Sequence, residues 1–222
     1  MASTQPLRLF FLRHGQTESS GGYPPFNGWR DAPLTELGQR QLDHAAEALS
    51  HIPFDAVYSS DLSRAMYGGR RIAEKANLEL KVESRWREIN FGRWEGMTYK
   101  EIYAEAPELI TKIFSPEGFD TPFPGGESLA AFFQRISRAM DELQAAHPAG
   151  GRIALVAHGG VCKALCGRFL KSSLETAWAI WQDFAAINVV DIYPDGRIIT
   201  RLINGCSGPE GFDRLAGADI FK

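Results

Sequence analysis

Two histidines in this sequence each follow a short apolar stretch directly and each precede a glycine. They stand in Leu12-Arg13-His14-Gly15 and in Val156-Ala157-His158-Gly159. A histidine at the end of a buried strand lies on a rigid support that faces the crevice beyond the sheet, and the glycine lets the backbone approach a ligand closely. One such histidine alone more often has a structural role. The matching pair favours a functional site.

Three charged residues are candidates to join the histidines. Arg13 precedes the first histidine, and an arginine at a buried strand end needs an anion or a carboxylate as partner. Arg64 follows the predicted strand that ends at Ser59-Ser60, although alone it would be interpreted as a solvated helix residue. Guanidinium groups suit phosphoryl oxygens. Glu88 ends the next predicted strand and is a candidate proton donor, with a surface carboxylate as the alternative.

Motifs for other chemistries are missing. The sequence has no His-Glu-x-x-His or Cys-x-x-Cys pair, no phosphate loop, no Gly-x-Ser-x-Gly elbow and no dinucleotide fingerprint. Cys162 and Cys166 lie one helical turn apart without further ligands nearby, which predicts buried thiols rather than a zinc site. We therefore expect no metal ion and no cofactor. The remaining histidines fall in or at the ends of predicted helices and are expected at the surface: His44, His51 and His147.

The apolar pattern predicts strands that alternate with helices. Strands are expected over 7–12, 54–59, 80–88 and 153–157, followed by a hairpin of 187–193 and 197–203 around Asp195-Gly196. Helices are expected from 34–38 through Leu49, over 61–77, from Thr98 to Pro107, over 128–147 and after Gly159-Gly160. The run 153–157 is continuously apolar, which is typical of a strand covered on both faces.

Two long stretches rich in glycine and proline, 19–33 and 114–127, are predicted loops, and 204–222 is predicted to be peripheral. We expect substrate specificity to come from the Gly21 to Asn27 loop and the Phe114 to Phe123 excursion, because loops of this length in a compact domain are more often functional than idle. Five aromatic residues could line a pocket there or pack into the core: Phe26, Trp29, Phe91, Phe114 and Phe123.

The alternation defines the fold class. No repeat, low-complexity tract or linker divides the 222 residues, so we expect a single domain over 1–222. Strands buried on both faces and separated by helices predict an α/β fold, a three-layer α/β/α sandwich with a mostly parallel central sheet. Such sheets place ligand sites beyond the carboxyl ends of their strands, where the candidate residues stand.

Composition narrows the classes of function. With 44% hydrophobic and 23% charged residues the chain is expected to be globular, and a net charge of −3 argues against a whole-surface nucleic-acid binder. Three cysteines are too few for a disulfide scaffold, which favours a cytoplasmic protein. An arginine interrupts the apolar run at 7–12, and no run is long enough to cross a bilayer, so neither export nor a membrane partner is expected. Periodicity alone leaves a homodimer open.

Several motifs together resemble the histidine phosphatase superfamily, also called the phosphoglycerate mutase-like family. The resemblance extends over most of the chain. Its residues are Leu12-Arg13-His14-Gly15-Gln16-Thr17-Glu18, Gly28-Trp29 with Asp31, Pro33-Leu34-Thr35 and Gly38, Ser59-Ser60-Asp61-Leu62 with Arg64-Ala65, Glu88 with Phe91-Gly92 and Trp94-Glu95-Gly96, Gly125-Gly126-Glu127-Ser128, and His158-Gly159-Gly160. Each motif alone is unspecific, whereas the set is highly specific.

The resemblance implies a phosphoglycerate mutase-like fold and a role for each matching residue. His14 would be the nucleophile that becomes phosphorylated, Arg13, Arg64 and His158 would hold the phosphoryl oxygens, and Glu88 would be the general acid and base. It also implies substrate contacts from Arg13, Gln16, Ser20, Asn27, Gly28, Arg64, His158 and Gly159. Ser20 departs from the asparagine that many members carry at this place, so this contact differs here.

The family contains hydrolases and mutases, and one segment separates them. Glu88-Ile89-Asn90-Phe91-Gly92-Arg93-Trp94-Glu95 is similar to the broad-range phosphatase branch, which includes α-ribazole phosphatase-like and phosphoserine phosphatase-like members, and lacks the tyrosine- and lysine-containing loop of glycolytic mutases. The first hypothesis is therefore a metal-independent phosphomonoesterase that acts on a small phosphorylated metabolite. The alternatives are a bisphosphoglycerate-dependent mutase and a phosphate-binding module without turnover.

Overall fold

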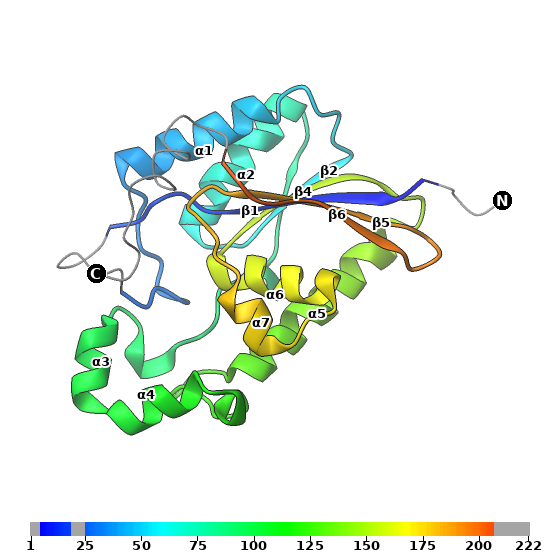
Figure 1. The fold of residues 1–222 in the computed structure, drawn as a ribbon. Coiled ribbons are helices and arrows are strands. Elements are labelled where there is room, and N and C mark those ends of the chain that lie inside the picture. The colour runs from blue at the N-terminus through cyan, green and yellow to red at the C-terminus, as the bar shows by residue number, and fades with distance from the viewer. Residues whose placement is uncertain (1–4, 19–24, 207–222) are drawn as a thin grey trace.

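A central sheet of six strands organises the chain in the computed structural model, which describes residues 5–18 and 25–206 (Figure 1). The strand order is β3-β2-β4-β1-β5-β6. The strands are β1 (Leu7–Arg13), β2 (Ala56–Ser59), β3 (Leu80–Val82), β4 (Gly151–Ala157), β5 (Ile187–Ile192) and β6 (Ile198–Gly205). The pairs β1–β4, β2–β4 and β2–β3 are parallel, while β5 is antiparallel to both neighbours. The expected mostly parallel sheet is confirmed.

Helices cover both faces of the sheet, which confirms the three-layer α/β/α sandwich. In Figure 1, α1 (Glu36–Ala48) and α2 (Ser63–Ala76) lie above the sheet. Below it lie α5 (Leu129–Ala146), α6 (Gly159–Leu170) and α7 (Leu174–Ala179). The short helices α3 (Tyr99–Glu105) and α4 (Pro107–Ile113) extend away from the sheet at the lower left. No helix in the described part of the chain is long and apolar enough to span a membrane.

The first strand shows why two helical layers are needed. Leu9 and Phe11 are buried in the hydrophobic cluster of the α5 and α6 side, whereas Phe10 and Leu12 are buried in the cluster with α1 and α2. Successive side chains of a strand point to opposite faces, so an uninterrupted apolar strand buries surface on both sides. β4 follows the same rule and holds β1 in parallel register from Leu7 to Arg13. The paired strands β1 and β4 therefore form a rigid support, and the candidate residues His14 and His158 directly follow it.

The strand predicted over 80–88 is wrong in extent. β3 ends at Val82, and Ser84–Trp86 form a turn of 3-10 helix instead. Trp86 is fully buried in the main core, and its indole N–H donates to a Glu83 carboxylate oxygen at 3.0 Å. Burying this large side chain turns the chain away from the sheet edge. Glu88 therefore lies in the loop after this turn and not at a strand end.

Four smaller expectations also change. Pro107 ends one helix as predicted but begins another, α4, because proline suits a first helical position. The helix α7 was not expected. The strand β6 continues to Gly205, so residues 204–205 of the predicted peripheral tail belong to the sheet. The part of this tail from residue 207 on lies outside the described residues. His147 is half-buried rather than at the surface, because its ring hydrogen-bonds the Tyr58 hydroxyl at 2.9 Å.

Candidate active site

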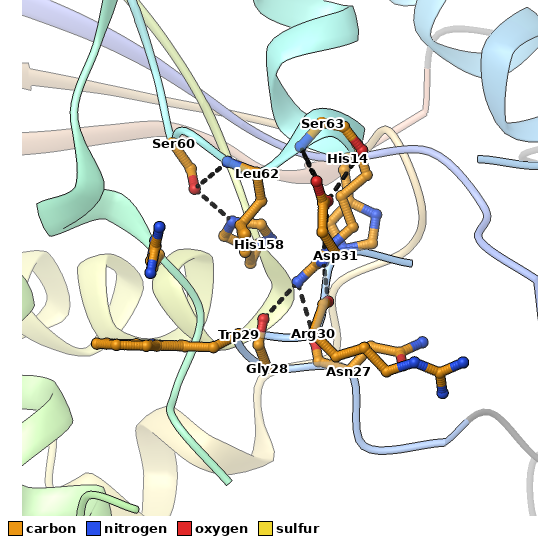
Figure 2. A network of polar contacts seen from close by, with 12 residues as sticks. His14, Asn27, Gly28, Trp29, Arg30, Asp31, Ser60, Leu62, Ser63 and His158 are labelled. Carbon is orange, nitrogen blue, oxygen red and sulfur yellow. Dashed lines mark hydrogen bonds and ion pairs between the residues drawn. The ribbon is translucent and has the colours of Figure 1, made fainter. Parts of the chain in front are cut away.

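Three neighbouring strands end at the same edge of the sheet, and the candidate residues follow them. His14 comes directly after β1, His158 directly after β4, and Ser60 directly after β2. The rings of His14 and His158 lie with centroids 5.3 Å apart and planes at 63°. Figure 2 shows the two rings and Ser60 close together. The two strand-end histidines thus share one site.

The hydrogen bond of His14 defines which ring nitrogen can react. Nδ1 lies 2.7 Å from the carbonyl oxygen of Gly15. A carbonyl only accepts, so Nδ1 carries the hydrogen and Nε2 keeps its lone pair. Burial, followed by the positive charges of Arg64 and Arg13, lowers the pKa of His14 well below its ordinary value. The ring is therefore neutral and nucleophilic at Nε2.

His158 is suited to donate rather than attack. Its Nε2 lies 2.9 Å from the hydroxyl of Ser60, which already accepts the Leu62 backbone N–H at 3.3 Å. We assign the hydroxyl hydrogen to Nε2, which places the ring hydrogen on Nδ1. Burial and then the charge of Arg64 lower the pKa of His158 well below its ordinary value, so it is neutral too. Nδ1 is buried and has no partner among the described residues.

Arg64 is a fully buried arginine whose contacts are almost all to backbone oxygens. Its terminal nitrogens donate to the carbonyls of Arg30 at 2.7 Å, Asn27 at 3.0 Å and Gly28 at 2.7 Å. The nearest carboxylate oxygen, on Asp31, is 3.9 Å away. The buried Nε–H has no partner in the described part of the chain. The guanidinium is therefore held mainly by uncharged carbonyl groups.

Arg13 is held in a similar way from the other side. One terminal nitrogen donates to the backbone oxygen of Gln182 at 2.6 Å, and the guanidinium carbon lies 3.9 Å from the ring centroid of Phe184. Burial lowers the pKa of Arg13, with Glu88 acting in the opposite direction. Like Arg64, it keeps a buried Nε–H without a partner within 5–18 and 25–206.

Three buried donors thus have no partner within residues 5–18 and 25–206: Nε–H of Arg13, Nε–H of Arg64 and, with the hydrogen assigned as above, Nδ1–H of His158. A buried donor without a partner costs about 1–3 kcal/mol, more for a charged group, so three of them in one place indicate a ligand with several acceptors. A tetrahedral oxyanion has the required oxygens. This arrangement is able to stabilise the charge of a phosphoryl group during transfer.

Glu88 reaches the same site from the loop after β3. Oε2 accepts a hydrogen bond from the backbone N–H of Gly160 at 2.8 Å. Oε1 accepts one from the backbone N–H of Ile89, the residue after Glu88, at 3.0 Å. Burial raises the pKa of Glu88 in spite of these N–H groups and of the charges of Arg64 and Arg13. The carboxyl group therefore keeps a proton to higher pH than usual, as a general acid requires.

Of the other predicted contact residues, some contact the two arginines and others do not. Gly159 begins α6 against the Arg13 guanidinium, and Gly28 and Asn27 face Arg64 with their carbonyls. The buried Asn27 Oδ1 has no partner among the described residues. The Gln16 amide oxygen accepts the Thr35 hydroxyl at 3.2 Å. Ser20 and residues 21–24 of the predicted specificity loop lie outside the described residues.

The five aromatic residues divide between core and site. Phe26, Phe91, Phe114 and Phe123 pack against one another in the main core. Trp29 is the exception at 42% exposed: its indole N–H donates to the Glu88 carbonyl at 3.0 Å, and its ring lies under Arg87. Only Trp29 of the five therefore borders the site through an exposed face.

The sequence patterns did not predict the residues that hold Arg13 and orient His158. Gln182 and Phe184 hold Arg13, and Ser60 orients His158. Ser60 stands at the end of a predicted strand, and this position could have identified it as a candidate site residue. Gln182 offers none, since its carbonyl is the contact and any residue has one.

The prediction that Cys162 and Cys166 are buried thiols is confirmed. Cys162 and Cys166 are buried free thiols, and burial raises the pKa of Cys166 to about 12. Across residues 5–18 and 25–206, no group of three His, Cys, Asp or Glu side chains could hold a metal ion.

A neutral histidine beside convergent guanidinium donors at the carboxyl edge of a three-layer sandwich defines a phosphoryl-transfer protein. Residues 9–205 match the family model described as histidine phosphatase superfamily (branch 1). The chain therefore belongs to this superfamily, as a phosphomonoesterase of the histidine phosphatase type.

Similar proteins include several phosphatases. Phosphoserine phosphatase 1 of Hydrogenobacter thermophilus is 30% identical over 202 residues, which are 90% of this chain and 93% of that protein. Glucosyl-3-phosphoglycerate phosphatase of Mycobacterium tuberculosis is 36% identical over 171 residues, 74% of this chain and 75% of the relative. The native structure of a mycobacterial glucosyl-3-phosphoglycerate phosphatase matches with a TM-score of 0.80 at 29% identity, covering 90% of this chain and all of that chain.

Proposed function

We propose that this chain hydrolyses a small phosphorylated metabolite through a phosphohistidine intermediate on Nε2 of His14. Arg13, Arg64 and His158 hold the phosphoryl oxygens, and Glu88 is the general acid and base. One observation carries the proposal: three buried donors without a partner in the described part of the chain lie by a histidine whose Nδ1–H is engaged by the Gly15 carbonyl. This geometry leaves Nε2 free to attack phosphorus.

In the first step, the Nε2 lone pair forms a bond to phosphorus as the bond from phosphorus to the ester oxygen breaks. Glu88 donates its proton to that oxygen, so the leaving group departs as a neutral alcohol. The donors of Arg13, Arg64 and His158 stabilise the equatorial oxygens, where charge accumulates. The raised pKa of Glu88 supports its role as the acid.

The second step returns the enzyme to its starting state. Water attacks phosphorus and gives a proton to the Glu88 carboxylate, and the nitrogen–phosphorus bond breaks. Inorganic phosphate leaves, and His14 is neutral again. The low pKa of His14 supports this cycle, because a neutral imidazole is both the attacking and the leaving group.

The substrate is proposed at the level of a small phosphomonoester. The names of the relatives suggest phosphoserine and glucosyl-3-phosphoglycerate as first members of a screening panel. Phosphate release from each would be ranked by kcat/KM. The exposed Trp29 beside Glu88 supports contact with the leaving group on this side.

The decisive test is hydrolysis of p-nitrophenyl phosphate in excess chelator, with and without vanadate. We expect vanadate-sensitive turnover, its loss in His14→Ala, and an acid-labile phosphoryl group on Nε2 of His14 after rapid quenching. Full turnover by His14→Ala contradicts the proposal. Conversion of 3-phosphoglycerate to 2-phosphoglycerate with added 2,3-bisphosphoglycerate would indicate a mutase. Tight phosphate binding without turnover would indicate a binding module.

A further inference from the structure

The carboxylate of Glu95, which follows the 3-10 turn Gly92–Trp94, accepts four backbone N–H groups. Oε1 accepts from Trp29 at 2.8 Å and Phe91 at 3.0 Å. Oε2 accepts from Gly28 and Arg30, each at 3.0 Å. Four charge-assisted hydrogen bonds on one carboxylate are a strong and geometrically demanding set. Three of the four fix the consecutive residues 28–30.

The same short segment also contacts Arg64. The carbonyls of Asn27, Gly28 and Arg30, three residues labelled in Figure 2, accept from the Arg64 guanidinium. Within segment 27–30, Glu95 thus binds the N–H groups of residues 28–30, and Arg64 binds the carbonyls of residues 27, 28 and 30. The anion and the cation are not paired directly, and each bonds to peptide groups of the segment.

Close packing leaves this segment little freedom. A Cβ added at Gly28 would lie 2.0 Å from the Ile89 carbonyl and 2.5 Å from Oε1 of Glu95, so only glycine fits. Trp29 in the same segment donates its indole N–H to the Glu88 carbonyl. The position of segment 27–30 therefore affects both the phosphate-binding cation and the backbone of the proposed acid.

We propose that Glu95 is a positioning residue of the phosphatase. It holds segment 27–30 so that the carbonyls of this segment orient Arg64 with its unpartnered Nε–H toward the substrate phosphoryl group. This inference rests on the proposed function, in which Arg64 binds phosphate. Glu95 touches no reacting atom, and its effect is on phosphate affinity.

The first test compares Glu95→Gln with Glu101→Gln. A glutamine offers one acceptor oxygen in place of two and turns an NH2 donor toward backbone N–H groups. We expect E95Q to raise the KM for p-nitrophenyl phosphate and the Ki for inorganic phosphate about tenfold, with a smaller change in kcat. Glu101 also accepts a backbone N–H, that of Thr98 at the start of α3, and E101Q is expected to change neither constant. A folded E95Q enzyme with unchanged KM and Ki overturns the proposal.

The second test asks whether Glu95 acts through Arg64. In an Arg64→Ala background, E95Q is expected to leave the phosphate affinity nearly unchanged, because the group it positions is gone. An equal fold-change in both backgrounds overturns the proposal. Glu95→Asp, which keeps the charge, is expected to recover part of the affinity. Thermal melting identifies folded variants, and E95Q carries the test if Glu95→Ala unfolds.

Calorimetric titration with inorganic phosphate separates this inference from the proposed function. It measures affinity without turnover. If wild type binds phosphate, E95Q weakens that binding and no variant hydrolyses esters, the positioning role stands and the proposed hydrolysis fails. If wild type hydrolyses esters and E95Q matches it in phosphate affinity, the hydrolysis stands and the positioning role fails.

Discussion

The backbone N–H of Gly160 donates to Oε2 of Glu88 at 2.8 Å, which joins the proposed acid to the first turn of α6. His158 is the residue before this helix, so the acid and one phosphate donor are held by the same turn. The contact needs glycine, because a Cβ at position 160 would lie 2.2 Å from Oε1 of Glu88. Acid placement and phosphate binding therefore share one support.

Gly160→Ala tests the placement of the acid. The methyl group is expected to displace the Glu88 carboxyl and lower kcat for alkyl phosphates by about 100-fold, the lower range for a lost general acid. With p-nitrophenyl phosphate, whose leaving group needs less protonation, the loss is expected to be smaller. The Ki for inorganic phosphate serves as the control for an intact phosphate site. Equal losses with both substrate types would contradict this role for Glu88.

Ser60→Ala tests the orientation of His158. Without the hydroxyl, Nε2 loses its hydrogen-bond partner and the ring can place its hydrogen on either nitrogen, so Nδ1 is no longer a fixed donor. We expect kcat/KM to fall about tenfold. Ser59→Ala is the matched control, since the Ser59 hydroxyl donates to the Ser60 carbonyl and not to the histidine. Similar effects of both variants would speak against the Ser60–His158 pair.

The pH dependence follows from the directions of two pKa shifts. Attack requires neutral His14, whose pKa lies well below its ordinary value, so activity is expected to persist into the acidic range. The leaving group requires protonated Glu88, whose pKa is raised, so activity is expected to decline as pH rises through that value. The profile of kcat/KM is then a bell whose acidic limb lies below the ordinary histidine pKa and whose alkaline limb lies above the ordinary glutamate pKa.

Glu88→Gln identifies the alkaline limb of this bell. The variant is expected to lower kcat/KM by about 10²–10⁴-fold and to remove the decline at higher pH. The ionisation of the substrate itself persists in the variant and provides the internal control. An alkaline limb of unchanged midpoint in Glu88→Gln would exclude Glu88 as its origin.

Asp191→Asn tests stability away from the site. The Asp191 side chain on β5 is fully buried and accepts hydrogen bonds from Arg8 and Arg201. Burial acts to raise its pKa, but the hydrogen bonds of the two arginines prevail and lower it. A lowered pKa contributes stability above the unfolded pKa, and that stability is lost as pH falls through the folded value. Because the arginines are 35% and 46% exposed, we expect a loss of about 1–2 kcal/mol at pH 7.

Urea unfolding at pH 7 and at acidic pH measures this effect. The difference between wild type and Asp191→Asn is expected to shrink toward low pH, where the aspartate is protonated in both folded and unfolded states. Asp195→Asn, an exposed change in the hairpin turn, is the control and is expected to be nearly neutral. An unchanged difference at low pH would contradict the linkage.

The strand-end residues were predictable because their signal is local. Apolar runs before His14 and His158 indicate buried strands, and parallel strands bring their carboxyl ends together. Glu88 was predicted as a proton donor from its place at the end of a strand, but it lies in a loop, since the burial of Trp86 ends β3 early. Propensity along the chain does not contain this tertiary effect.

Contacts through the backbone were not predictable. The carbonyls of Gln182 and of segment 27–30 hold the two arginines, and no residue type is needed to supply a carbonyl. Glu95 was visible as part of a motif, but its four N–H partners depend on a turn that only the fold creates. Likewise, His147 was predicted at the surface because its partner Tyr58 lies on β2, and a contact between residues so far apart in the sequence is not visible in the local pattern.

The central place of β1 has a consequence for biosynthesis. Leu7 pairs with Gly151 on one side and Ile192 on the other. During synthesis, the apolar strand β1 therefore leaves the ribosome long before β4 and β5. Until then both edges of β1 are unpaired, and we expect chaperones to bind them. Because the ladder of β1 with β5 extends to Ile192, we expect a nascent chain to gain affinity for phosphate late, after almost all of the described sequence has emerged.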